Sequence, residues 1–306
     1  MVSRLILGTV QFGMNYGIAN SEGKPDLGKV GSILRRAADH GIRVLDTAAA
    51  YGDSETVIGT VLAGDPALKR HFQVVSKIAP LPQNLSGEER RSFIRKSAET
   101  SLRNLQVEQL YGILFHREKD TGDLPVLREL QRQGKVRYCG FSADGGLPED
   151  LSGAEMIQVP GNVLDRRFIP FPGKKPEKLF VRSVYLQGLL MMPEEQIPSG
   201  LEGVIPYRRR LAALAEKNGM SPAELYMRYL FSFPEVDGVL TGVDNPDQLD
   251  FNIRMAAGGP LDKALLQEIL NMIPDLPESW IRPKFWPKKK RLFFHSELDL
   301  HAQSRQ

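Results

Sequence analysis

Four residues of types that can transfer protons stand at the ends of apolar runs in the first part of the chain: Asp46, Tyr51, Lys77 and His116. Asp46 ends a short apolar run, and Tyr51 follows five positions later in the next loop. Lys77 and His116 each end another apolar run. Such runs are typical of buried strands, and side chains just past parallel strands can converge on one pocket. The spacing therefore predicts a proton-transfer site.

Positioning these residues requires parallel strands that end on one side of the molecule. Apolar segments predict strands at 5–10, 42–46, 72–77, 110–116, 136–142, 155–159, 179–184 and 236–241. Helical spacing occurs at 26–40, 55–63, 87–105, 123–133, 207–218, 223–231 and 246–256, with a short helix expected at 147–151. This alternation predicts an α/β fold, a (β/α)8 TIM barrel.

The rival fold is a doubly wound dinucleotide-binding sheet, which needs Gly-x-Gly after its first strand. None of the 28 glycines forms that pattern, which argues against the rival. The sixth unit is expected to be irregular, with a turn near 164–167 and then a loop, because prolines interrupt residues 160–176. We interpret 1–306 as one domain, in which 262–306 form a C-terminal helix and a tail with Trp280, Trp286 and a basic cluster at 288–291.

Composition narrows the functional classes. Forty basic residues balance 37 acidic ones, so no basic stripe indicates nucleic acid. Cys139 is the single cysteine, which excludes an intrachain disulfide and favours a reducing compartment. The chain shows no signal peptide and no apolar run near the length of a membrane helix. We expect a cytoplasmic protein with a small-molecule substrate, no metal and no membrane association; the sequence sets no oligomeric state.

The chain resembles the aldo-keto reductases over nearly its whole length. The matching segments are Leu7-Gly8-Thr9-Val10-Gln11-Phe12-Gly13, Asp46-Thr47-Ala48-x-x-Tyr51-Gly52-x-Ser54-Glu55, Ser76-Lys77, Leu114-Phe115-His116, Gly134 to Ser142, Gln187-Gly188-Leu189-Leu190, and Gly242-x-x-x-Pro246-x-Gln248-x-x-x-Asn252. Each is weak alone, but their order and spacing together are specific. The resemblance implies a barrel that binds a nicotinamide cofactor without a Rossmann domain and reduces carbonyl groups.

Carbonyl reduction adds a hydride to carbon and a proton to oxygen. Tyr51 is the candidate proton donor, although a free tyrosine has a pKa of about 10. A nearby Lys77 ammonium would lower that pKa, and Asp46 would pair with Lys77 and hold it. His116 would hydrogen-bond the carbonyl oxygen and orient it beside Tyr51.

The resemblance also implies the cofactor residues. Ser142 and Gln158 match positions that hold the nicotinamide carboxamide. Gly242 leads to a helix start whose backbone N–H groups suit a phosphate. Gln248 and Asn252 match positions that face the adenosine. We expect NADP(H), with NAD(H) as the alternative.

Three departures from the family pattern affect these expectations. Ala143 follows Ser142 where the family usually has asparagine. The aromatic residue that stacks on nicotinamide falls at Ser183, so either the stacking is lost or Tyr185, beside Leu186, reaches in. Asp244 stands where many members carry a cation for the adenosine 2′-phosphate, which predicts weaker selection for NADP(H).

Loops after the strands set the substrate. The candidate contacts are Phe12, Asn15, Tyr16, Arg117 and Arg182, of which three favour a polar or anionic, sugar-derived compound. Residues 182–188 also resemble reductases of bacterial surface-sugar pathways. The alternative function is a cofactor-binding regulatory or scaffold subunit, like the channel-associated β-subunits. A phosphate-binding barrel isomerase would leave the segment 242–252 unexplained.

Overall fold

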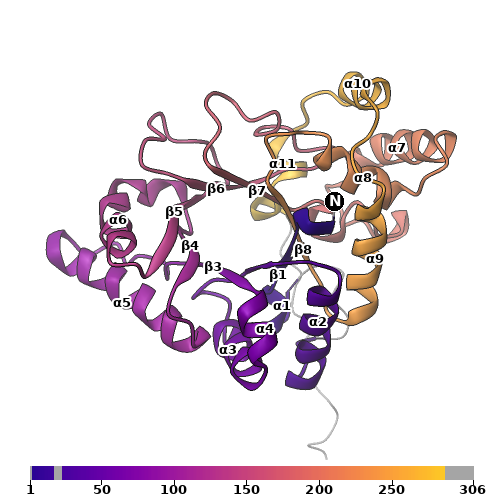
Figure 1. Cartoon of the computed structure of the whole chain (residues 1–306). Coiled ribbons are helices and arrows are strands. Elements are labelled where there is room, and N and C mark those ends of the chain that lie inside the picture. Colours follow the sequence, from indigo (N-terminus) through magenta and orange to yellow (C-terminus); the bar gives the residue numbers. More distant parts are fainter. Residues whose placement is uncertain (1, 17–22, 287–306) are drawn as a thin grey trace, which may run out of the picture.

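Eight parallel strands close into a barrel in sequence order (Figure 1). This computed structural model describes residues 2–16 and 23–286. The strands are β1 (Leu5–Gly8), β2 (Val44–Asp46), β3 (Gln73–Lys77), β4 (Leu110–Phe115), β5 (Val136–Ser142), β6 (Met156–Pro160), β7 (Lys178–Arg182) and β8 (Gly238–Gly242). The predicted TIM barrel is confirmed. Because all strands run the same way, their carboxyl ends meet at one mouth.

Helices surround the barrel (Figure 1). The α-helices are α1 (Val10–Gly13), α2 (Leu27–Asp39), α3 (Ser54–Gly64), α4 (Pro66–His71), α5 (Gly87–Leu105), α6 (Leu124–Arg132), α7 (Ile205–Lys217), α8 (Pro222–Phe231), α9 (Pro246–Ala257), α10 (Lys263–Met272) and α11 (Glu278–Ile281). Short 3-10 helices are η1 (Val2–Arg4), η2 (Glu118–Asp123), η3 (Leu186–Gly188), η4 (Glu194–Gln196), η5 (Glu202–Val204) and η6 (Pro283–Phe285).

Two apolar layers hold the barrel together. Inside it, Ile6, Val75, Leu114, Met156 and Phe180 form one buried cluster with Leu240. A second and larger cluster fills the space between the strands and the outer helices. These are the layers expected of parallel strands that are buried on both faces.

The irregular sixth unit occurs as expected, because no helix forms in residues 161–177, all of which are described. The expected short helix at 147–151 is wrong. Pro148 interrupts that segment, and the Asp150 carboxylate accepts hydrogen bonds from both the N–H and the hydroxyl of Ser152, which favours a turn over a helix. The basic cluster at 288–291 lies outside the described residues.

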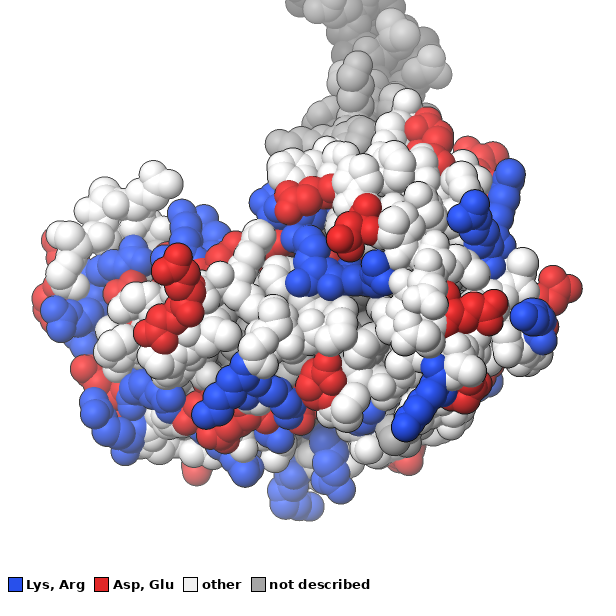
Figure 2. Space-filling model, turned by 90° about the horizontal axis from the view of Figure 1, so that it is seen from above, with Lys and Arg blue, Asp and Glu red and all other residues white. Residues whose placement is uncertain are grey.

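Acidic and basic side chains are interspersed over the face seen in Figure 2. None of the described helices combines the length and the apolar character needed to cross a bilayer. No group of histidine, cysteine, aspartate or glutamate side chains that could hold a metal ion occurs within residues 2–16 and 23–286.

Candidate active site

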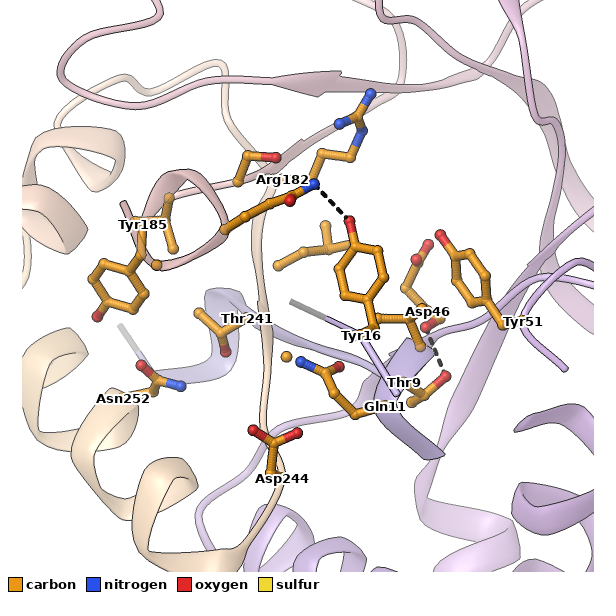
Figure 3. A pocket seen from close by; sticks show the side chains of 18 of the residues that line it. Thr9, Gln11, Tyr16, Asp46, Tyr51, Arg182, Tyr185, Thr241, Asp244 and Asn252 are labelled. Carbon is orange, nitrogen blue, oxygen red and sulfur yellow. Dashed lines mark hydrogen bonds between the residues drawn. The ribbon is translucent and has the colours of Figure 1, made fainter. Parts of the chain in front are cut away.

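A cavity of about 660 Å³ opens at the barrel mouth (Figure 3). Its size is within the range of small-molecule sites. Thirteen of the residues predicted from the sequence line it: Tyr16, Asp46, Tyr51, His116, Ser142, Gln158, Arg182, Ser183, Tyr185, Gly242, Asp244, Gln248 and Asn252. Several of these are the last residues of their strands, so the closed barrel itself brings them together.

Beneath the cavity lies a buried ion pair between Lys77 and Asp46. The two residues are 1% and 2% exposed, and Lys77 Nζ donates to Asp46 Oδ1 at 2.6 Å and to the Thr47 carbonyl at 2.9 Å. Burial disfavours the charged form of Lys77, but the carboxylate of Asp46, together with its hydrogen bond to Lys77, outweighs the burial and raises the lysine pKa. Lys77 therefore stays an ammonium ion.

Tyr51 lies directly beside this ion pair. Lys77 Nζ is 5.1 Å from the centroid of the Tyr51 ring, and the His116 ring meets the same ring edge-on at 5.8 Å. Figure 3 shows the Tyr51 hydroxyl pointing into the cavity. The Lys77 ammonium thus lies beside the ring whose hydroxyl faces the cavity.

Two glycines allow the loop that carries Tyr51 to pack against α1. A Cβ atom at Gly13 would overlap the Tyr51 carbonyl, and one at Gly52 would overlap the Gly13 carbonyl. Gly52 also has φ of 57°, which side chains rarely tolerate. Gly13 and Gly52 thus allow the end of α1 and the Tyr51 loop to pack with their backbones in contact. This contact fixes the position of the Tyr51 backbone.

Buried hydroxyl groups brace the same region. The Thr9 hydroxyl donates to the Asp46 carbonyl at 2.9 Å, and the Ser54 hydroxyl donates to the Thr9 carbonyl at 2.8 Å. The Thr47 hydroxyl donates to Ser54 Oγ at 3.0 Å. These bonds tie the ends of β1 and β2 to the start of α3.

A buried glutamate fixes the neighbouring strand. Glu55 accepts from the Ser76 hydroxyl at 2.6 Å and from Asn104 Nδ2 at 3.3 Å. Ser76 precedes Lys77, so this contact links the lysine-bearing strand to α3 and α5. Glu55 and Ser76, which belong to the motifs that match the family, therefore help to hold the strand that carries Lys77 in place.

His116 remains uncharged near neutral pH. Burial, followed by the positive charges of Lys77, Arg182 and Arg117, lowers its pKa from 6.5 to about 4. A neutral imidazole can donate one hydrogen bond to an oxygen without adding charge.

Gln158 connects the predicted carboxamide residues to the ion pair. Its Nε2 donates to Asp46 Oδ2 at 2.8 Å, and its Oε1 accepts from the Ser142 hydroxyl at 3.4 Å. Ala143, which replaces the usual asparagine, is buried.

At the opposite end of the cavity, the start of α9 follows β8. Asn245 Oδ1 accepts from Gln248 N at 3.0 Å, and Pro246 follows as the first residue of the helix, as the sequence predicted. Gln248 Oε1 in turn accepts from Asp244 N at 2.8 Å. Asp244 itself is buried, at 8% exposure.

The turn after β7 has an unusual backbone. Ser183, Leu186 and Gln187 have φ of 70°, 48° and 52°. In Figure 3 the Tyr185 ring lies on the opposite side of the cavity from Tyr51, so it does not reach the proton-transfer end. Leu186 is 1% exposed, packs in the core and does not line the cavity, which corrects its assignment to the cofactor site.

Three substrate candidates are also corrected. Phe12 is fully buried in the core, because α1 turns its side chain inward. Asn15 and Arg117 are exposed and do not line the cavity, and Arg117 contacts Asp120 at 3.6 Å instead. Tyr16 and Arg182 do line it.

Other residues also line the cavity without having been predicted from the sequence, chiefly Gln11, Asp144 and Thr241. Gln11 belonged to a quoted motif, and Asp144 lies two residues after Ser142, so proximity to strand ends was the available signal.

Gln11 Oε1 and the Tyr185 hydroxyl are buried and have no hydrogen-bond partner within the described chain. A Cβ at Gly242 would lie 2.5 Å from Gln11 Oε1, so the glycine keeps this part of the wall open. Polar atoms without partners beside an open wall fit a hydroxyl-rich nucleotide.

Comparison with known proteins identifies the family of this chain. A family model described as the aldo/keto reductase family matches residues 4–159 and 170–273, so the chain belongs to that family. An uncharacterized oxidoreductase of Mycobacterium bovis is 26% identical over 288 residues, which cover 83% of this chain and 84% of the relative. A 6-dehydroglucose reductase of Novosphingobium aromaticivorans is 32% identical over 125 residues, 36% of this chain and 40% of the relative.

Among solved structures, an aldo-keto reductase of Bacillus halodurans in its holo form superposes with a TM-score of 0.68. It is 21% identical, and the match covers 91% of this chain and 95% of that one, which supports the fold. With the family shown, the protein is an NAD(P)H-dependent oxidoreductase that acts on small carbonyl compounds.

Proposed function

We propose that this protein reduces a sugar-derived aldehyde or ketone to an alcohol, with Tyr51 as the proton donor. The observation that carries the proposal is the buried Lys77–Asp46 pair, with Lys77 Nζ 5.1 Å from the Tyr51 ring at one end of the cavity. An ion pair with a purely structural role would not need a partly exposed phenol on its cavity side. Proton transfer to a carbonyl oxygen does need such a phenol, because the phenol is the proton donor.

A nicotinamide cofactor, when bound, would supply the hydride that the carbonyl carbon accepts. Tyr51 gives its phenolic proton to the carbonyl oxygen, and the Lys77 ammonium stabilises the resulting phenolate. Asp46 keeps Lys77 charged and in place, because a buried lysine without a partner tends to lose its proton. Neutral His116 donates a hydrogen bond to the same carbonyl oxygen and orients it toward Tyr51.

The rest of the cavity would hold the nucleotide. Ser142 and Gln158, which line the cavity, would bind the carboxamide, and Gly242 and the first turn of α9 would bind phosphate oxygens. Gln248 and Asn252 would contact the adenosine end. We propose NADP(H) as the preferred cofactor, with a preference that Asp244 weakens.

The sugar-derived substrate rests on two observations. Polar groups, among them Tyr16, Arg182 and Gln187, line the cavity on the side of β7, and one curated relative is named as a 6-dehydroglucose reductase. The regulatory-subunit alternative is not favoured, because a scaffold role makes no use of the paired acid, lysine and phenol.

The test is turnover. NADPH oxidation should be measured with sugar aldehydes, keto sugars and a generic aromatic aldehyde. We expect Tyr51-dependent reduction of at least one of these classes. Tight cofactor binding with no turnover of any of them would instead support the regulatory subunit.

A further inference from the structure

Arg182 presents an incompletely used guanidinium group to the cavity. It is the last residue of β7, lines the cavity and has a side chain that is 29% exposed. Its Nη2 donates to the Ala143 carbonyl at 2.9 Å. Within the described part of the chain, no hydrogen bond engages its Nε or its Nη1. A guanidinium fork is thus anchored on one nitrogen and has donors to spare.

The carboxylate nearest to Arg182 is shared with other cations. Asp144 Oδ1 lies 3.5 Å from Arg182 Nη2, at the limit of a hydrogen bond. Asp144 Oδ2 accepts from Arg282 Nη2 at 3.0 Å and lies 3.6 Å from Lys284 Nζ. Because two further cations draw on this carboxylate, Asp144 neutralises Arg182 only in part.

The charge of Arg182 acts at the end of the cavity where the chemistry is placed. It is one of the positive charges that, after burial, keep the pKa of His116 low, and it also opposes the rise in the pKa of Tyr16. Two carboxylates lie at this end: Asp46 is already engaged by Lys77 and Gln158, and Asp144 is shared with Arg282 and Lys284. An anionic group between Arg182 and His116 would therefore meet positive charge.

We propose that Arg182 binds a carboxylate of the substrate, so that the natural substrate is an oxo acid: an aldehyde or ketone that also carries a carboxylate, such as a sugar acid. This inference rests on the proposed carbonyl reduction at Tyr51. A planar guanidinium matches the two oxygens of a carboxylate, and charge-assisted bonds of this kind are stronger than neutral ones.

The C-terminal segment completes this subsite. Arg282, the residue before η6, is 4% exposed. It bridges Asp144 to Glu278, whose Oε2 accepts a hydrogen bond from Arg282 Nη1 at 2.5 Å. Arg167 Nη1 also donates to the Asp144 carbonyl at 2.9 Å. Asp144 and Arg282 are thus positioning residues that hold the backbone and side chain against which Arg182 rests.

The experiment compares a matched pair of substrates, 4-formylbenzoate and its neutral methyl ester. We expect the wild type to favour the acid in kcat/KM by at least about tenfold, one charge-assisted bond's worth. Arg182→Gln should lower kcat/KM for the acid by about thirtyfold or more, mainly through KM, and leave the ester within about threefold. Arg182→Lys should recover part of the loss, since it restores the charge without the fork.

Arg91→Gln is the control, because it removes the same charge from an exposed residue of α5 that does not line the cavity. It should leave kcat/KM for both substrates unchanged. The affinity of each variant for 4-hydroxymethylbenzoate, measured by calorimetry with NADPH present, gives a second readout that needs no turnover, because neither the alcohol nor NADPH can accept a hydride. It should weaken in Arg182→Gln alone.

Equal wild-type activity on acid and ester would overturn the carboxylate subsite, as would an equal loss on both substrates in Arg182→Gln. The proposed function fails differently, through an absence of turnover of either substrate or through activity that survives Tyr51→Phe. The calorimetric arm still decides on Arg182 in that case.

Discussion

The two ends of the cavity are built in different ways. At the Tyr51 end, the charges of Lys77 and Asp46 are buried and paired: both residues are almost fully enclosed, and a hydrogen bond of 2.6 Å joins them. At the end beside α9, the groups are backbone amides, an exposed Gly242 and side chains such as Gln248 that sit at a helix start. The first end is set by strand ends and a closed network, and the second by a helix cap and a turn.

Substitutions at the two ends should therefore differ in their effects. Buried charges depend on each partner, so the loss of one exposes another to an unfavourable environment. Groups at a helix start bind a ligand that also has many other contacts, so each contributes a smaller share. The effects of substitutions should therefore decrease from the proton-transfer end to the α9 end.

The largest effect is expected from Tyr51→Phe. The substitution removes the proposed proton donor and leaves the ring, so kcat should fall at least a hundredfold, about 2.7 kcal/mol, while the cofactor dissociation constant stays nearly unchanged. Tyr16→Phe, which removes another phenol of the same cavity, is the matched control and should retain most of the kcat. Retention of more than about a tenth of the wild-type kcat in Tyr51→Phe would exclude it as the donor.

Lys77→Met should be nearly inactive and less stable. It leaves Asp46 as a buried carboxylate without its cation, a change that typically costs about 3–5 kcal/mol of unfolding free energy. Asp46→Asn should impair turnover because it leaves the buried Lys77 without its carboxylate partner. Urea unfolding monitored by circular dichroism, beside steady-state rates, measures both effects.

The control for this pair is Lys24→Met, which breaks the exposed ion pair with Asp53. Pairs of that kind contribute about 0–1 kcal/mol. Should Lys77→Met be no more costly than Lys24→Met, the contrast between buried and exposed charge at the barrel mouth would be wrong.

The fold was largely predictable because each strand is a short apolar run and each helix has a spaced apolar face. The misses have local causes. Helix α4 is six residues long, too short for periodicity, although Asp65 before Pro66 was a readable cap: its carboxylate accepts from Ala67 N at 3.0 Å. Strand β7 ends two residues earlier than expected because Ser183 has a positive φ, which no pattern of apolar residues reveals.

The proton-transfer end was also more readable than the rest of the site. Asp46 and Lys77 end their strands, so their convergence follows from the barrel alone. Phe12 and Leu186 were misassigned because whether a loop side chain turns inward depends on tertiary packing. Asp144 gained its place from Arg282, which is 138 residues away and outside any local pattern.

The third prediction concerns pH. The pKa of His116 is lowered from 6.5 to about 4 in the folded chain, so between these values the unfolded chain binds more protons. Unfolding free energy should therefore fall as pH decreases from about 6.5 toward 4, with His116 contributing about 1–2 kcal/mol of loss at pH 5. His116→Gln should lose that contribution.

Chemical denaturation of both proteins at pH 7.5 and pH 5 measures the difference. His40→Gln, which changes an exposed histidine at the end of α2, is the control and should retain the wild-type pH dependence. An unchanged slope in His116→Gln would show that the imidazole is not held neutral by its surroundings.

The smallest effect is expected at the α9 end, from Asp244→Arg. A carboxylate near the adenosine 2′-phosphate repels it by roughly 1 kcal/mol if the charges are about 4 Å apart in water. We therefore expect the wild type to use NADPH and NADH within about a hundredfold in kcat/KM, and Asp244→Arg to shift the ratio toward NADPH by about tenfold. The buried backbone N–H of Asp244 still reaches Gln248 Oε1 in the variant, so the helix start should persist.

Asp247→Arg places the same charge in the first turn of α9 and outside the cavity lining, and it should move the ratio less. A wild-type preference for NADPH of a thousandfold or more would show that other cations already hold the phosphate, and an unmoved ratio in Asp244→Arg would show that this carboxylate does not face it.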